Sequence, residues 1–277
     1  MKNNTLKTFI SIFLSILILL GSQILSELIA SIFVLIKVPT FICNIIAGFL
    51  YVFLSYKLLK LLCVKYLKSN LEDYYIPKFK LDIKWFIIGL FLPLIITVIY
   101  LLLPGSFVKV DISLLDKLSL ITSGIFFFGL GAGIVEEMVF RGIIMNALDK
   151  RYNKVIAVII PSILFGFVHV IGTDFNFLSC LLVILSGTMV GIMFSLIASL
   201  KCSIWNSAIV HILWNMIIVG GIISIGTTTN EYSIFNYILN TNSILITGGD
   251  FGIESSLIAL LFYFLISLIT YRFYKKI

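Results

Sequence analysis

The sequence predicts an all-α protein, a polytopic membrane helical bundle with about eight transmembrane helices. Three observations predict this fold class: the composition, the length of the apolar runs and the distribution of basic charge. Of 277 residues, 60% are hydrophobic and only 12% are charged, whereas soluble domains carry about 25% charged residues. Apolar runs long enough to cross the ~30 Å hydrocarbon core recur along the whole chain. A soluble enzyme, a disordered chain and a disulfide-rich secreted scaffold are therefore excluded, and lipid favours helices.

The apolar runs define the predicted spans, which together make residues 1–277 a single membrane domain. The spans are Phe9–Ile36, Phe41–Leu62, Trp85–Leu103, Leu118–Leu148, Val155–Ile171, Phe177–Leu200, Ile204–Ile223 and Leu257–Tyr271. The first span follows lysines, as a signal peptide does, but its apolar run is too long for one and no clear cleavage motif follows. We therefore expect it to be retained as an uncleaved span.

The basic residues predict that both termini lie in the cytoplasm. With the N-terminus placed inside, sixteen of the twenty Lys and Arg residues fall in cytoplasmic segments. Only Lys37, Lys109 and Lys117 fall outside, and the long outer loop Ser224–Ser256 has no Lys or Arg. Because cytoplasmic loops of membrane proteins are enriched in Lys and Arg, this asymmetry sets the orientation. The net charge of +7 is thus a topology signal, and we expect no nucleic-acid partner.

Pairs of glycine residues predict where helices approach each other closely. Gly129 and Gly133 form one G-x-x-x-G sequence, and Gly187 and Gly191 form another. In lipid this spacing lets two helix backbones come into contact. Gly129 and Gly133 lie inside an apolar helix that no strand precedes, so they do not form a nucleotide-binding loop.

A few polar residues lie inside the predicted spans. A charged side chain at the bilayer centre costs ~2.5–3.5 kcal/mol on insertion scales, so each needs a partner or a function. Glu27 stands near the outer interface, and we expect it to have no catalytic role. The others fall in three spans of the predicted core, residues 118–223: Glu136, Glu137, Arg141, His169, Asn206, His211 and Asn215.

Helical spacing places these residues on shared faces. Glu137 and Arg141 are separated by four positions, as are His211 and Asn215, so each pair lies on one side of its helix. Glu136 is rotated by ~100° from Glu137, so Arg141 cannot easily serve both carboxylates. Glu136 is therefore the candidate for a general base.

The depths of the polar residues are also compatible. At 1.5 Å per residue from the cytoplasmic boundary, Glu136 lies ~20 Å deep and His169 ~22 Å deep. His211 and Asn215 lie at ~12 and ~18 Å. The three helices can thus present these groups to one polar pocket.

A carboxylate, two imidazoles and an amide in one pocket are sufficient to activate water and stabilise an oxyanion, which amide hydrolysis requires. The same carboxylate and histidines could instead bind zinc with an open fourth position. The sequence has no H-E-x-x-H motif, so we expect no cofactor and zinc is not indicated.

The polar residues occur in three motifs that resemble those of a known family. The sequences E-E-M-V-F-R at Glu136–Arg141, F-G-F-V-H at Phe165–His169 and H-I-L-W-N at His211–Asn215 are similar to the E-E-x-x-x-R, F-x-x-x-H and H-x-x-x-N motifs of the CAAX-protease and bacteriocin-processing (CPBP, Abi) family of intramembrane endopeptidases. The resemblance covers roughly Gly129–Asn215, and the three motifs stand in the family's order on three different spans.

The resemblance implies specific roles for these residues. Glu136, assisted by His169, would activate the attacking water, His211 and Asn215 would hold the oxyanion, and Glu137 and Arg141 would support the site. It implies a metal-independent glutamic-type peptidase acting on a membrane-associated peptide or protein. Prenylated tails in eukaryotes, and peptide precursors or membrane peptides in bacteria, are the substrate classes of such enzymes.

Two other functional classes remain open at this point. The same pocket could bind a peptide or partner without cleaving it, as in a bacteriocin self-immunity or scaffolding membrane protein. Alternatively, Glu136 and the histidines could relay protons in a transporter, although no inverted repeat is evident in the sequence. The excess of Lys over Arg and the abundance of Ile and Asn fit an AT-rich genome, so we expect a multi-pass protein of a bacterial plasma membrane.

Overall fold

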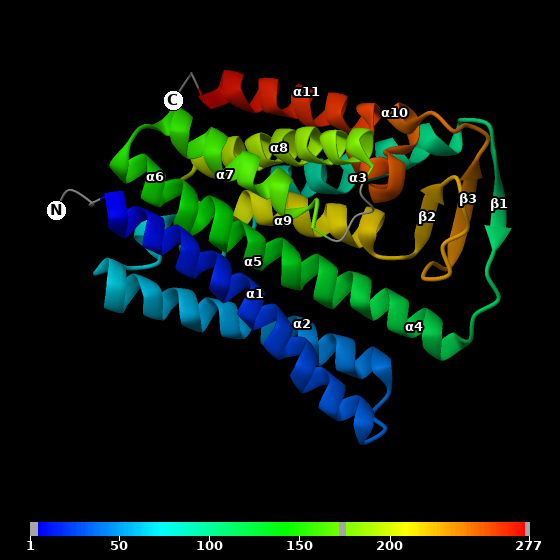
Figure 1. The fold of residues 1–277 in the computed structure, drawn as a ribbon, viewed down its shortest axis with the longest axis horizontal. Helices are drawn as coiled ribbons and strands as arrows, with labels where there is room; N and C mark the ends of the chain where they lie inside the picture. Colours follow the sequence, from blue (N-terminus) through cyan, green and yellow to red (C-terminus); the bar gives the residue numbers. More distant parts are fainter. Residues whose placement is uncertain (1–4, 172–175, 275–277) are drawn as a thin grey trace.

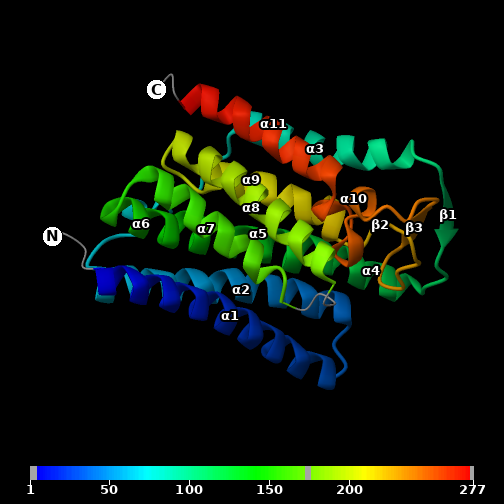
Figure 2. The same cartoon turned by 45° about the horizontal axis from the view of Figure 1, so that its top comes forward.

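The structure is a computed structural model that describes residues 5–171 and 176–274. It is mostly helical, and the long helices lie roughly side by side (Figure 1). The helix α1 begins and α11 ends at one end of the bundle, which we call the terminal end. A small sheet lies at the opposite end, which we call the sheet end (Figures 1 and 2).

The helices follow the predicted spans closely. The α-helices are α1 (Thr5–Leu35), α2 (Thr40–Leu61), α3 (Ile83–Leu101), α4 (Leu114–Thr122), α5 (Gly133–Glu137), α6 (Met145–Arg151), α7 (Lys154–Val168), α8 (Phe177–Leu200), α9 (Trp205–Trp214), α10 (Ile244–Thr247) and α11 (Leu257–Tyr274). Between them lie the π-helical segments η1 (Leu62–Leu67), η3 (Ser123–Ala132), η4 (Met138–Ile144) and η5 (Asn215–Val219), and the short 3₁₀ turns η2 (Glu72–Tyr74), η6 (Gly249–Phe251) and η7 (Ile253–Ser255).

Among the described residues, five helices are long and apolar enough to cross a membrane. They are Thr5–Leu35, Thr40–Leu67, Ile83–Leu101, Leu114–Arg151 and Phe177–Leu200. The other three predicted spans coincide with shorter apolar helices, Lys154–Val168, Trp205–Val219 and Leu257–Phe273. Large apolar side chains such as Phe9, Phe91 and Leu265 are exposed on the outside of the bundle. These helices and their apolar outer surfaces identify an integral membrane protein.

The fourth predicted span is longer and less regular than expected. It is one helix of 38 residues, Leu114–Arg151, in which the π-helical segments η3 and η4 flank the single α-turn of α5. The fifth predicted span ends earlier than expected, because α7 stops at Val168 and His169 caps it. Both differences concern helices that carry the predicted site.

The expectation of an all-α protein was wrong at the sheet end. There β1 (Gly105–Lys109) pairs antiparallel with β3 (Phe235–Leu239), and β2 (Ile223–Gly226) pairs parallel with β3, in the order β1-β3-β2. The segment predicted as the outer loop Ser224–Ser256 therefore holds β3, most of β2, α10 and two 3₁₀ turns. This folded cap covers one end of the bundle (Figure 2).

The predicted glycine contacts are confirmed. A Cβ atom on Gly187 of α8 would lie 2.6 Å from the Cα atom of Gly166 in α7. A Cβ atom on Gly133 of α5 would lie 3.1 Å from the Cα atom of Ile212 in α9. The other glycine of each pair is equally crowded by a neighbouring helix. Glycine at these positions lets α7, α8, α5 and α9 pack closely, which brings the three motifs together.

Candidate active site

The two glutamates and the asparagine lie where the helices change their hydrogen-bonding pattern. Glu136 and Glu137 form the end of α5, between the π-helical segments η3 and η4, and Asn215 begins η5. Single π-turns inside α-helices occur frequently at functional sites, because they rotate side chains and free carbonyl groups. The backbone beside Glu136, Glu137 and Asn215 thus departs from a regular α-helix.

Glu137 and Arg141 form the predicted ion pair. Arg141 Nη1 lies 2.8 Å from Glu137 Oε1, and both side chains are completely buried. Arg141 also donates from Nη2 to the backbone carbonyl of Gly191 at 3.2 Å, and its guanidinium group lies over the rings of Phe165 and Phe194 at 4.5 and 5.1 Å. The pair therefore connects the helix of the glutamates to α7 and α8.

His211 lies between the two glutamates. Its Nδ1 is 3.2 Å from Glu137 Oε1, and its Nε2 is 3.8 Å from Glu136 Oε2. Its ring stacks on Phe194 with a centroid separation of 4.8 Å. Glu137 Oε1 thus accepts hydrogen bonds from both Arg141 and His211. The buried ion pair therefore also holds the imidazole ring of His211 in position.

The sequence associated Glu136 with His169, whereas the structure places Glu136 closest to His211. Spacing along a single helix could not show this, because the contact depends on how α5 and α9 are rotated against each other. Glu136 Oε2 is buried and has no hydrogen-bond partner among the described residues. It is therefore free to accept a proton or a hydrogen bond inside the site.

His169 is oriented by its own helix. Its Nδ1 lies 2.7 Å from the backbone carbonyl of Phe165, one turn earlier. A carbonyl oxygen only accepts, so Nδ1 must carry the proton and a neutral His169 presents Nε2 as an acceptor. The ring also contacts Phe165 and Phe251, at centroid separations of 4.4 and 5.9 Å.

Asn215 is held by the π-helical part of the fourth span. Its Nδ2 donates to the backbone carbonyl of Phe128 in η3 at 2.9 Å. An amide nitrogen carries two hydrogens, so one N–H group remains for another acceptor. Asn215 is buried one helical turn from His211, as the spacing predicted.

All four predicted catalytic residues line one cavity of about 260 Å³. Glu136, His169, His211 and Asn215 lie on its wall with aromatic residues that include Trp214. The depth argument made from the sequence therefore agrees with the structure. The cavity thus combines the carboxylate of Glu136, a hydrogen-bond acceptor on the imidazole of His169, and hydrogen-bond donors on His211 and Asn215.

The comparison with protein families identifies the part of the chain that holds this cavity. Residues 118–217 match the family described as Rce1-like, type II CAAX prenyl endopeptidase Rce1-like. The resemblance to CAAX proteases is confirmed over these residues. The Rce1-like segment runs from α4 into η5 and contains all six predicted site residues. No curated protein matches the chain. The match supports a membrane protease.

Four residues outside the Rce1-like segment also line the cavity, and the sequence analysis missed them: Val219, Phe251, Glu254 and Tyr263. Phe251 and Glu254 lie in η6 and η7, after the sheet. Trp214 Nε1 donates to Glu254 Oε2 at 3.3 Å, and burial raises the pKa of the Glu254 carboxyl. The available signal was weak: Glu254 is one of three acidic residues in a predicted loop without basic residues.

Glu27 lies outside both the Rce1-like segment and the cavity. It is exposed on α1 and accepts a hydrogen bond from Gln23 Nε2 at 3.1 Å. The residue therefore offers a matched control for substitutions of Glu136.

The described side chains of the cavity do not form a metal site. Within residues 5–171 and 176–274, no three His, Cys, Asp or Glu side chains are grouped closely enough to hold a metal. In the Rce1-like segment, the imidazole proton of His169 is directed to a backbone carbonyl and Glu137 is paired with Arg141. This arrangement does not match the three protein ligands of a His₂Glu zinc site.

Proposed function

We propose that the protein is an intramembrane endopeptidase that hydrolyses a peptide bond in a membrane-associated substrate with a water molecule activated by Glu136 and His169. The observation that carries the proposal is that Glu136, His169, His211 and Asn215 line one cavity within the segment that matches a CAAX endopeptidase family. No serine or cysteine nucleophile is required.

In this mechanism Glu136 is the general base. Its buried Oε2 has no partner among the described side chains and backbone groups, so it can accept a proton from a water molecule in the cavity. His169, with Nδ1 directed to the Phe165 carbonyl, accepts a hydrogen bond at Nε2 from the second O–H group of that water and so orients its oxygen. The oxygen attacks the carbonyl carbon, and Glu136 then returns the proton to the departing amine as the C–N bond breaks.

His211 and Asn215 stabilise the oxyanion that forms during the attack. His211, held through Nδ1 by Glu137, would donate to the oxyanion from Nε2, while Asn215 contributes its second N–H group. Loss of one such donor typically reduces kcat by about 10²–10³-fold.

Glu137 and Arg141 act as positioning residues. Glu137 receives hydrogen bonds from Arg141 and His211 on one oxygen, which fixes the orientation of the His211 ring. Arg141 neutralises Glu137, so the only uncompensated carboxylate of the E-E motif is the one that serves as base.

We further propose that no metal takes part, because the donors of residues 5–171 and 176–274 do not assemble three ligands around one point. The eight apolar segments would all lie in the membrane, with the lysine-rich terminal end in the cytoplasm and the sheet end outside. The substrates would be peptide precursors or membrane peptides of a bacterial plasma membrane.

The experiment that tests this function is a comparison of membrane peptides in cells that carry the wild-type chain or a variant. Glu136→Ala, His169→Ala and His211→Ala should each leave the same substrate uncut, while western blots of the membrane fraction show normal amounts of protein. The Glu27→Gln variant should cleave normally. Cleavage that persists in all three alanine variants would contradict the proposal.

A further inference from the structure

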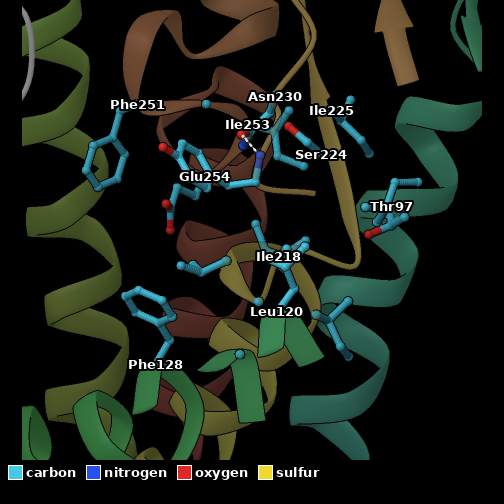
Figure 3. Close-up of a pocket in the computed structure, with 18 of the residues that line it drawn as sticks. Thr97, Leu120, Phe128, Ile218, Ser224, Ile225, Asn230, Phe251, Ile253 and Glu254 are labelled. Atoms are coloured by element: carbon cyan, nitrogen blue, oxygen red, sulfur yellow. Dashed lines mark hydrogen bonds between the residues drawn. The ribbon is translucent and has the colours of Figure 1, made fainter. Parts of the chain in front are cut away.

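A second cavity adjoins the catalytic one. It has a volume of about 520 Å³ and lies at the sheet end, between η5, β2 and the 3₁₀ turns that precede α11. Phe128, Val219, Phe251 and Glu254 line both cavities. Figure 3 shows Phe128, Phe251 and Glu254 on one side of this sheet-end cavity, with Ile225 and Thr97 on the other. A chain extending from the catalytic residues therefore has space to continue toward the sheet end.

The walls of the sheet-end cavity carry negative charge and no positive charge. Its two charged residues are Asp250 and Glu254, and none of the described residues that line it is Lys, Arg or His. Neutral polar groups of five further residues add acceptors for hydrogen bonds: Thr97, Ser123, Ser224, Asn230 and Tyr232. A ligand that supplied a positive charge would complement this surface.

Glu254 stands at the junction of the two cavities. Trp214 holds its carboxyl group through one hydrogen bond, and Tyr263 donates to its backbone carbonyl at 3.3 Å. Burial raises the pKa of the Glu254 carboxyl, so an isolated carboxylate is unfavourable there and a cationic group beside it would stabilise the ionised form. Asp250, by contrast, is exposed to solvent.

No Lys or Arg side chain of the described residues pairs with these carboxylates, and only the imidazoles of His169 and His211, on the catalytic cavity, act on the charge of Glu254. No ion pair joins Asp250 or Glu254 to any residue in the described part of the chain. The sequence from Ser224 to Ser256 contains no Lys or Arg. A cationic group of a ligand would therefore be the first positively charged partner inside the sheet-end cavity.

We propose that the sheet-end cavity binds the part of the peptide substrate next to the cleaved bond, and that Glu254 and Asp250 select a positively charged side chain in that part. The proposal rests on the proposed endopeptidase function, since it names the class of peptide that the same site accepts. It assigns specificity to residues that lie outside the Rce1-like segment, so it concerns this chain and not the matched family in general.

The test is a binding measurement that does not need catalysis. The full chain with Glu136→Gln, in nanodiscs of zwitterionic lipid, is titrated against two fluorescent peptides of equal length. The two peptides share an apolar segment, and beside that segment one carries lysine and the other glutamate. Fluorescence anisotropy should show the lysine peptide binding at least about tenfold more tightly. Adding Asp250→Asn and Glu254→Gln together should abolish that preference.

Matched controls separate a local effect from the general charge of the surface. Glu231→Gln removes an acidic residue of the same segment that does not line the cavity, and it should leave the preference unchanged. Because Asp250 is exposed, Asp250→Asn alone should fold normally and should lower the preference in part. Equal binding of the two peptides, no binding of either, or a preference that survives the double substitution would each overturn the proposal. A failed endopeptidase function would appear instead as unchanged peptides in cells.

Discussion

Replacement of Arg141 by methionine should destabilise the protein strongly. Methionine keeps much of the length and apolar volume of the side chain but leaves Glu137 as a fully buried carboxylate without its 2.8 Å partner. The carbonyl of Gly191 also loses its donor, and the guanidinium contacts with Phe165 and Phe194 are lost. Breaking a buried ion pair by removing one member costs about 3–5 kcal/mol.

The assay is reversible unfolding in mixed micelles, followed by tryptophan fluorescence. The double variant Glu137→Gln, Arg141→Met removes both charges, so it should be more stable than Arg141→Met alone even though it carries one more substitution. Both variants should lose activity, because Arg141→Met removes the group that holds Glu137 in place and the double variant also removes the carboxylate that positions His211. If Arg141→Met lowered the free energy of unfolding by less than about 1 kcal/mol, as expected for an exposed pair, the inferred burial of the ion pair would be refuted.

Three further predictions concern packing, pH and metal ions. Gly187→Val should destabilise the protein by about 1–3 kcal/mol through the clash with Gly166. Gly21→Val, at an open position of α1, should lower the free energy of unfolding far less in the same assay. Equal losses in the two variants would refute the close α7–α8 contact. A hydrogen bond from the Lys201 ammonium lowers the pKa of Asp82. This contact therefore stabilises the folded state above the ordinary pKa of aspartate, and the stabilisation is lost as the pH falls through the depressed value. Since Lys201 is 65% exposed, the stabilisation should stay below about 1 kcal/mol and should be absent when the unfolding of Asp82→Asn is followed over the same acid range. Exhaustive chelation should leave cleavage unchanged, and activity that is lost with a chelator and restored by zinc would contradict the metal-independent mechanism.

The sequence was sufficient to predict the features that depend on local spacing or on transfer into lipid. The positions of the apolar helices followed from hydrophobicity, the Glu137–Arg141 pair from the four-residue separation along one helix, and the shared pocket from the depths of His169 and His211. The glycine pairs predicted which helix faces touch, because close contact in lipid requires small residues at that spacing. These features are set by properties that each helix has on its own.

The features that were missed depend on contacts between segments far apart in the chain. The strand β3 is short and pairs with β1, more than a hundred residues earlier, so no local pattern marks it. Glu254 lies in η7, which follows this strand in the chain, and no local pattern places it at the catalytic cavity. The closer approach of His211 to the glutamates likewise depends on the relative rotation of α5 and α9, which periodicity does not determine.

The most direct test of the central claim is the cleavage of an identified substrate by the purified chain with Glu136→Gln. Glutamine keeps the size of the side chain and cannot accept a proton from water, so the rate should fall by about 10²–10⁴-fold, the contribution of a general base. Substrate binding and thermal stability should remain close to those of the wild type. A variant that cleaved the substrate at the wild-type rate would show that Glu136 does not activate the water.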